Sequence, residues 1–210
     1  MVATIDELVA VVSQLLARRS RVIVGIVGEP GSGKSTVAEA ISDQVDCRSV
    51  IVPMDGFHLS NRELKRLGRS ERKGAPDTFD VAGYVNLLRR LRDVDDDVVY
   101  APEYVRDLEE PIGGAIAVSS DIPVVFTEGN YLLHSEHGWD AVAPLLDGVW
   151  YLDSEPQRRV QRLIRRHERF GKTSDDAIAW ATGSDERNAS VVRRTRPAAN
   201  LWIDGDALLQ

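Results

Sequence analysis

Cysteine is nearly missing from this chain: Cys47 is the only one among 210 residues. No disulfide can therefore form within the chain, which suits a reducing compartment. Also missing are a hydrophobic run as long as a transmembrane helix and, at the N-terminus, the basic flank and continuous apolar core of a signal peptide. We expect a soluble cytoplasmic protein without a membrane partner.

Basic residues are also fewer than acidic ones. The formal net charge is −7 and the pI is near 5.2, whereas a general nucleic-acid binder normally has a net basic domain. No segment interleaves aromatic and basic residues as single-stranded nucleic-acid binders do. His134, His137 and His167 show no metal-ligand spacing with Cys47, so we expect neither a nucleic-acid partner nor a zinc site.

The chain does contain a phosphate-binding motif. The segment from Gly28 to Ser35 reads GEPGSGKS and fits the pattern G-x-x-x-x-G-K-[ST] at every fixed position, between an apolar run over 21–27 and a helical pattern over 35–45. Glycines allow backbone N–H groups to wrap a polyphosphate, while Lys34 can bridge its outer phosphates and the Ser35 hydroxyl can hold Mg²⁺. We predict that a nucleoside triphosphate is bound by Gly28, Glu29, Pro30, Gly31, Ser32, Gly33, Lys34, Ser35 and Thr36.

Strand-like and helical patterns alternate along the chain. A length of 210 residues, 43% of them hydrophobic, suits a single domain. The alternation predicts a three-layer α/β/α sandwich with a mostly parallel sheet of five to six strands. We expect strands over 21–27, 49–54, 97–100, 122–127, 148–152 and 200–203, and helices over 4–19, 35–45, 81–92, 139–146, 155–170 and 174–182.

Two acidic residues follow predicted strands. Asp55 comes after the apolar run 50–54 and Glu128 after the run 124–127, so in a parallel sheet both would lie at the same edge as the phosphate loop. One carboxylate could accept a proton from an attacking hydroxyl, and the other could hold Mg²⁺. Ordinary turn chemistry is the alternative, because Asp-Gly and Glu-Gly are common turn signals. The neighbouring phosphate motif favours the functional interpretation.

Arginines crowd the helix that is predicted over 155–170. Steps of three and four residues can place five of them on one face: Arg158, Arg162, Arg165, Arg166 and Arg169. Such a face repels itself unless an anion lies against it, and a triphosphate would supply that anion. We therefore interpret this helix as a lid. The alternative is a solvated basic helix with a few pairs to Glu155 and Glu168.

A second basic run contains Arg62, Lys65, Arg66, Arg69, Arg72 and Lys73. An anionic substrate would explain these charges, and so would an ordinary solvated helix, which the residues alone slightly favour. The sequence leaves open whether this run binds the substrate.

Several segments together resemble one group of kinases. Residues 54–61, MDGFHLSN, resemble the acceptor-site segment of P-loop kinases related to uridine kinase, phosphoribulokinase and bacterial pantothenate kinase. The segments 77–80 (DTFD), 102–106 (PEYVR) and 128–129 (EG) are similar to motifs of those kinases, and the arginine helix matches their lid. The resemblance covers about residues 22–204. It implies the P-loop NTPase fold with a helical lid, and an ATP-dependent kinase that uses Mg²⁺.

The resemblance also implies roles for the matching residues. Asp55 corresponds to the general base, Lys34 to a phosphate ligand, and Ser35 and Glu128 to the metal site. Arg162 and Arg166 correspond to the lid arginines. The residues implied in binding the acceptor are His58, Tyr104, Arg106, Glu128 and Asn188. The implied acceptor region spans about residues 55–120, and the implied lid about 154–190.

The identity of the small-molecule acceptor stays open. Uridine kinases usually carry Asp-Ser-Phe-Tyr where this chain has Asp-Gly-Phe-His at 55–58, and pantothenate kinases continue differently after Asp-Gly-Phe. Nucleosides, pantothenate-like alcohols and sugars are all candidates, and both a monomer and a homodimer fit. A nucleotide-dependent regulatory switch that acts on a protein partner is the alternative function, although its guanine-reading motif Asn-Lys-x-Asp is missing.

Overall fold

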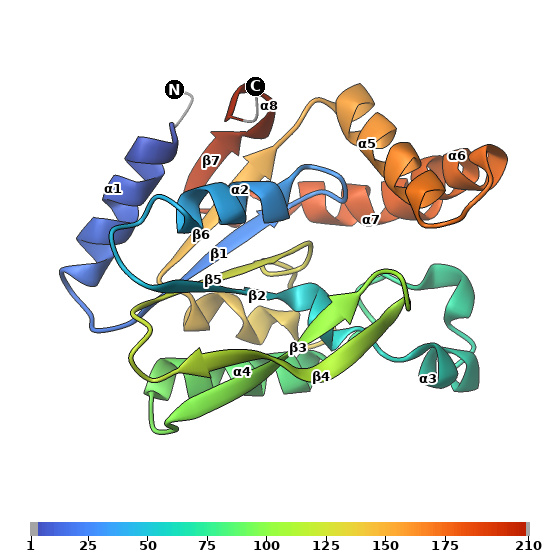
Figure 1. The fold of residues 1–210 in the computed structure, drawn as a ribbon. Helices are drawn as coiled ribbons and strands as arrows, with labels where there is room; N and C mark the ends of the chain where they lie inside the picture. Colours follow the sequence, from blue (N-terminus) through green and yellow to red (C-terminus); the bar gives the residue numbers. More distant parts are fainter. Residues whose placement is uncertain (1–3, 209–210) are drawn as a thin grey trace.

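A parallel sheet forms the centre of the molecule. The computed structural model describes residues 4–208, and its five-stranded sheet has the order β2-β5-β1-β6-β7 (Figure 1). All neighbouring strands in it run parallel, which confirms the predicted α/β fold. The strands are β1 (Val22–Gly28), β2 (Ser49–Pro53), β5 (Val124–Gly129), β6 (Gly148–Asp153) and β7 (Leu201–Asp204).

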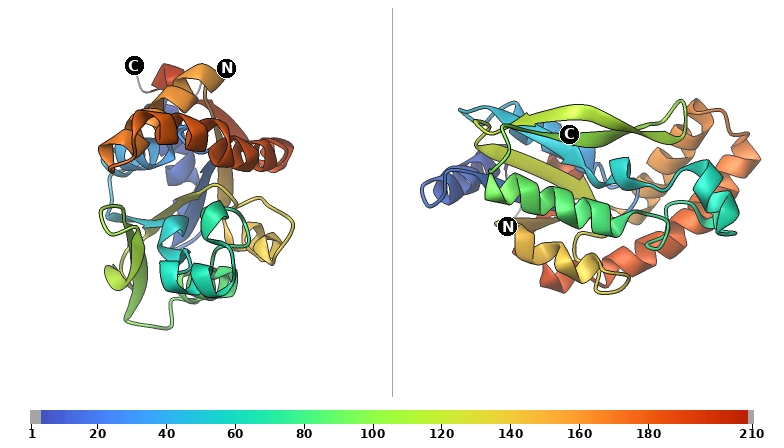
Figure 2. Two further views of the ribbon diagram at one scale, coloured as in Figure 1. Left: turned by 90° about the vertical axis from the view of Figure 1, so that its right-hand side faces the viewer. Right: turned by 90° about the horizontal axis from the view of Figure 1, so that it is seen from below.

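Both faces of the sheet are covered, and β1 shows how the sequence produces this. All seven of its residues are buried, as expected for a central strand in a parallel sheet. Val24 and Ile26 belong to the core cluster that includes residues of α1 (Ile5–Leu16) and α2 (Lys34–Ser42). Ile23 and Val27 belong to the opposite cluster, which includes residues of α4 (Val81–Asp93). The result is three layers, with α4 and a β-hairpin in front of the sheet when it is seen from below (Figure 2).

The hairpin corrects one part of the predicted sheet. The segment 97–100 was expected to be a strand of the parallel sheet, but β3 (Val98–Val105) instead pairs with β4 (Glu110–Ser119) in a separate antiparallel hairpin. The four-residue connection between the two strands is too short for a parallel crossover, so only antiparallel pairing is possible. The strand β4 was not predicted from the sequence.

The helices follow the predictions with several differences, among them the end of α2 at Ser42 rather than 45. α1 ends at Leu16 rather than 19, although its capping box between Thr4 and Glu7 is present. The helix expected over 139–146 is two 3₁₀ turns, η3 (Trp139–Ala141) and η4 (Ala143–Leu145), because Pro144 cannot continue an α-helix. α7 (Ser184–Arg193) was not predicted. The remaining short helices are η1 (Met54–Phe57), α3 (Asn61–Arg66), η2 (Ser70–Arg72), η5 (Arg196–Ala198) and α8 (Gly205–Leu208).

Three helices lie beyond the carboxyl ends of the strands, at the right of Figure 1. They are α5 (Pro156–Arg169), α6 (Ser174–Thr182) and α7. At the same edge, Pro53 pairs in register with Glu128, and Val27 with Gly129. The ends of β1, β2 and β5 therefore bring the phosphate loop, Asp55 and Glu128 together. Within residues 4–208, none of the helices has the length and apolar character needed to cross a membrane.

Candidate active site

The phosphate loop joins β1 to α2 and depends on its glycines. A Cβ on Gly28 would lie 2.7 Å from the carbonyl oxygen of Leu152. Gly31 and Gly33 have φ angles of 81° and 97°, a left-handed conformation that glycine adopts without strain. Gly33 is also the N-cap of α2 and provides no side-chain cap. The first N–H groups of this helix are thus available to an anion.

Two side chains of the loop, Lys34 and Ser32, have polar groups that a bound phosphate could contact. Lys34 is 8% exposed, and its ammonium donates to the carbonyl oxygens of Gly28 (3.0 Å) and Glu29 (3.1 Å) and to Asn130 Oδ1 (2.9 Å). Burial lowers the pKa of Lys34, although Glu128 and Asp55 oppose that shift. Ser32 Oγ is buried and has no hydrogen-bond partner among the described residues. A buried hydroxyl without a partner is costly, and a bound phosphate oxygen would satisfy it.

Ser35 and Glu128 form the candidate metal site. The Ser35 hydroxyl donates to Glu128 Oε1 at 3.0 Å. Burial raises the pKa of Glu128, against the opposing effect of Lys34. No group of three or more His, Cys, Asp or Glu side chains suited to a metal occurs within 4–208. Mg²⁺ in phosphate sites commonly takes one or two protein oxygens and completes its shell with phosphates and water, so this pair fits that cation.

Asp55 is the second residue of η1, the turn that follows β2. Its side chain is 28% exposed and lies 3.6 Å from Arg106 Nη2. His58 Nδ1 donates to the Asp55 carbonyl oxygen at 2.8 Å and lies 3.9 Å from its carboxylate. Burial opposes ionisation of Asp55, but His58, Arg106 and Lys34 together outweigh it and hold the pKa of this carboxyl below its usual range. Asp55 is therefore an ionised carboxylate at neutral pH.

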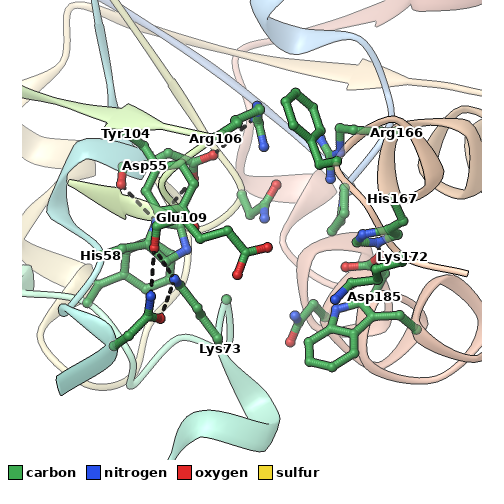
Figure 3. Close-up of a pocket in the computed structure, with 18 of the residues that line it drawn as sticks. Asp55, His58, Lys73, Tyr104, Arg106, Glu109, Arg166, His167, Lys172 and Asp185 are labelled. Carbon is green, nitrogen blue, oxygen red and sulfur yellow. Dashed lines mark hydrogen bonds and ion pairs between the residues drawn. The ribbon is translucent and has the colours of Figure 1, made fainter. Parts of the chain in front are cut away.

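Two cavities meet at Asp55. One, of about 280 Å³, is lined by the phosphate loop together with Glu128 and Arg162. The other, of about 240 Å³, lies between the β3–β4 hairpin, the segment 58–79 and the helices α5 to α7 (Figure 3). Both are lined by Pro30, Asp55, Arg106, Asn130 and Arg166. A ligand in one cavity can thus contact a ligand in the other at the Asp55 carboxylate. We call the first the phosphate cavity and the second the acceptor cavity.

The arginines of α5 divide between cavity and solvent. Arg166 lines both cavities and has no ion pair within the described chain. Arg162 pairs with Asp206 at 2.5 Å and donates to Ser154 Oγ at 3.0 Å. The other three arginines that the spacing can place on the same face, Arg158, Arg165 and Arg169, are exposed and line neither cavity.

An ion network centred on the buried Arg159 links the phosphate loop to α5 and α7. Arg159, 1% exposed, lies 3.1 Å from the Glu29 carboxylate, pairs with Glu186 and donates to the Pro30 carbonyl oxygen at 3.2 Å. Arg193 of α7 donates twice to Glu29, at 2.8 and 2.7 Å. The carboxylate of Glu29, a predicted nucleotide-binding residue, is thus engaged by arginines of α5 and α7. Only its backbone is left to face a phosphate.

The predicted acceptor residues line the acceptor cavity, with one exception. The His58 ring packs between Phe79, with 4.0 Å between ring centroids, and Tyr104, at 4.7 Å. Asn188 lies on α7 at the cavity wall, as does Asp185, which accepts a hydrogen bond from His167 at 2.7 Å. Glu128, which was also expected to contact the acceptor, lines the phosphate cavity instead.

The second basic run is mostly engaged elsewhere. Arg66 pairs with Glu63, and Arg69 and Arg72 both pair with Asp77. Among the basic residues of this run, only Lys73 lines the acceptor cavity.

Sequence reasoning missed several residues of the site. Asn130, two residues after Glu128, holds the Lys34 ammonium, and its position directly after β5 was the one signal that could have identified it. Lys172, Trp180 and Glu109 also line the acceptor cavity. Nothing in their local sequence indicates this, because they reach the cavity from separate elements.

The sequence and the fold of this chain are similar to those of several known proteins. Residues 23–204 match the Phosphoribulokinase / Uridine kinase family. A Schizosaccharomyces pombe protein provisionally named uridine kinase C227.14 is 33% identical over 96% of this chain and 91% of its own length. The uncharacterized protein YggC of Escherichia coli K12 is 33% identical over 91% of this chain and 81% of its own. The crystal structure of a provisionally assigned fructose transport system kinase from Silicibacter sp. TM1040 superposes with a TM-score of 0.81, at 36% identity, over 93% of this chain and 98% of that one.

Proposed function

The chain belongs to the phosphoribulokinase / uridine kinase family and is a kinase, and we propose that it transfers the γ-phosphoryl group of Mg·ATP to a hydroxyl of a small metabolite, with Asp55 as the general base. One observation carries this proposal: the Asp55 carboxylate lies where the phosphate cavity and the acceptor cavity meet. A general base must reach the attacking hydroxyl beside the phosphoryl group. A regulatory switch would not need a second polar cavity at this point.

The phosphate end of the nucleotide is assigned to the loop Gly28–Thr36. Its backbone N–H groups, the Ser32 hydroxyl and the Lys34 ammonium are donors to phosphate oxygens. Ser35 and Glu128 would hold Mg²⁺, which when bound neutralises charge on the β- and γ-phosphates. With phosphate bound, Lys34 would exchange carbonyl partners for phosphate oxygens.

The acceptor hydroxyl is assigned to Asp55. Because this carboxylate is ionised, it can accept the hydroxyl proton as the oxygen attacks the γ-phosphorus. Arg106, 3.6 Å away, would orient the carboxylate. His58, Tyr104 and Asn188 line the cavity in which the rest of the acceptor would bind.

Arg162 and Arg166 are assigned to the γ-phosphoryl group in the transition state of its transfer. Both line the phosphate cavity and come from α5, where a cation can stabilise the charge of the transition state. We therefore assign residues 154–190 to a lid and residues 55–120 to acceptor binding. A closed lid would exclude water and so limit ATP hydrolysis.

The variant Asp55→Asn tests the proposal. It removes the base but keeps the size of the side chain, so nucleotide affinity should stay within about twofold while turnover falls about 10²–10⁴-fold. Calorimetry with Mg·AMPPNP measures the first quantity, and acceptor-dependent ADP release the second. Asp46→Asn is the matched control, because Asp46 is exposed and away from both cavities. Wild-type turnover in Asp55→Asn would remove Asp55 from the role of base.

A further inference from the structure

Resting on the proposed kinase function, we propose that the acceptor is a small aliphatic polyol or hydroxy acid with an anionic group, a carboxylate or a phosphate, which Lys73 and Lys172 bind. This assignment goes beyond the open choice among nucleosides, alcohols and sugars. It rests on the charges, hydrogen bonds and ring contacts of the acceptor cavity.

Two arginines and two lysines line the acceptor cavity. The lysines, unlike the arginines, neither pair with a carboxylate of the described residues nor line the phosphate cavity. Arg106 pairs with Asp55, and Arg166 also lines the phosphate cavity. Lys73 and Lys172 line the acceptor cavity alone. Neither lysine has an ion pair with any residue from 4 to 208. Their charges are therefore available to a ligand that is not the nucleotide.

Lys73 is held in place by neutral groups. Its ammonium donates to Asn61 Oδ1 at 2.7 Å and to the Glu109 carbonyl oxygen, and it lies 5.3 Å from the centre of the Tyr104 ring. A lysine ammonium has three N–H donors, so one is left for a ligand. Burial lowers the pKa of Lys73, and the nearby Glu109 and Glu110 only partly oppose this. An anion in the cavity would relieve that burial cost.

Lys172 reaches the cavity from the opposite wall. Gly171, with φ of 93°, ends α5, and the Lys172 N–H donates to the His167 carbonyl oxygen at 3.1 Å. This is the hydrogen bond of a Schellman turn. The turn carries the Lys172 ammonium to 4.6 Å from the Trp180 ring. Figure 3 shows Lys73 and Lys172 on opposite sides of the cavity. An anionic group bound by both would join the lid to the acceptor region.

The carboxylates of the cavity do not cancel these charges. Asp55 pairs with Arg106, and Asp185 accepts a hydrogen bond from His167. Glu109 is the third, and it is exposed at the end of the hairpin, where water screens its charge. The half-buried lysines are less screened. The balance of charges around Lys73 and Lys172 is therefore positive and favours the binding of an anion.

The aromatic rings of the cavity offer little room for a nucleobase. Phe79 and Tyr104 pack on either side of His58. Lys172 lies over Trp180, and Arg169 lies 5.7 Å from the Phe170 ring. Proteins commonly bind unpaired bases by stacking them on aromatic faces. Because each of these rings already contacts another side chain, an aliphatic acceptor fits better than a nucleoside.

A binding measurement tests the lysines without knowledge of the natural acceptor. The full chain is saturated with Mg·AMPPNP, so that the phosphate loop is occupied, and malonate or inorganic phosphate is titrated by calorimetry. We expect Lys73→Met and Lys172→Met each to weaken binding about 10- to 100-fold, the loss of a charge-assisted hydrogen bond. Lys65→Met is the control, because Lys65 is exposed in the same basic run. Lys73→Arg should retain most of the affinity.

Two results of this titration would overturn the inference. One is that neither anion binds the wild-type protein at millimolar concentration. The other is that Lys73→Met and Lys172→Met bind as well as Lys65→Met while all three variants retain the wild-type melting temperature.

An ADP-release assay with matched acceptors distinguishes carboxylate from phosphate. Sorbitol is compared with gluconate and sorbitol 6-phosphate, glycerol with glycerate and glycerol 3-phosphate, and uridine represents the nucleosides. The anionic member of a set should exceed its neutral counterpart at least tenfold in kcat/KM. A higher kcat/KM for a neutral polyol or for uridine would overturn this inference and leave the kinase proposal intact. Failure of Mg·AMPPNP to bind would overturn the kinase proposal itself. If no compound accelerates ADP release, the calorimetric titration with malonate or phosphate decides whether Lys73 and Lys172 bind an anion.

Discussion

The phosphate cavity and the acceptor cavity are built in opposite ways. The phosphate cavity is formed largely by the contiguous segment Gly28–Thr36, whose glycines, N–H groups and lysine act through local backbone geometry. The acceptor cavity takes its walls from η1, the segment 61–79, the hairpin and the lid helices. A triphosphate has a constant shape, so a local motif suffices to bind it. Recognition of one metabolite needs side chains from many elements.

Among the three changes that test this comparison, Lys34→Ala should give the largest effect, because it removes a side chain of the local phosphate motif. It removes the only lysine of the phosphate cavity, so we expect turnover to fall about 10³-fold and the nucleotide to bind more weakly. Calorimetry with Mg·AMPPNP and steady-state ADP release measure both quantities, with Lys65→Ala as control. Normal nucleotide affinity in Lys34→Ala would count against the loop as the phosphate site.

Glu29→Gln should show how far the loop depends on the rest of the protein. The change weakens three contacts from Arg159 and Arg193 and leaves the buried Arg159 with Glu186 as its one carboxylate partner. We expect a loss of about 3 kcal/mol in unfolding free energy and a rise of about tenfold in the KM for ATP. Glu136→Gln, at an exposed position, is the control in urea unfolding and kinetics. An unchanged KM would mean that the loop keeps its shape without the lid helices.

The pH profile should show the smallest effect, and it tests Asp55, one of the residues that line both cavities. A lowered pKa keeps Asp55 ionised as pH falls toward the usual carboxylate range, and the base is lost only below it. At saturating Mg²⁺ and acceptor, kcat should change less than about twofold between pH 6 and pH 8. A decline in kcat as the pH falls through this range would point to a histidine, and not Asp55, as the base.

The local features of the molecule could be predicted from its sequence. The strand, loop and helix at β1 and α2 lie within a few residues of the expected positions, because each follows from neighbouring residue types. Asp55 and Glu128 were brought together by a topological rule, since parallel strands end at one edge of the sheet. The alternation of strand-like and helical patterns does not indicate which residues share a cavity.

Contacts between distant segments could not be predicted. Glu29 and Arg193 are 164 positions apart, and no local pattern links them. Lys73 looks like its basic neighbours in sequence, yet only the fold of the hairpin against the segment 61–79 directs it into the acceptor cavity. The missed strand β4 has the same origin, because its pairing depends on β3 and not on its own weak pattern.

The most direct test is a crystal structure of the full chain with Mg·AMPPNP and an acceptor that stimulates ADP release. The account predicts the triphosphate in the loop Gly28–Thr36, Mg²⁺ beside Ser35 and Glu128, and an acceptor hydroxyl within hydrogen-bond distance of the Asp55 carboxylate. A nucleotide bound elsewhere, or an acceptor hydroxyl that lies away from Asp55 with the phosphate loop filled, would contradict it.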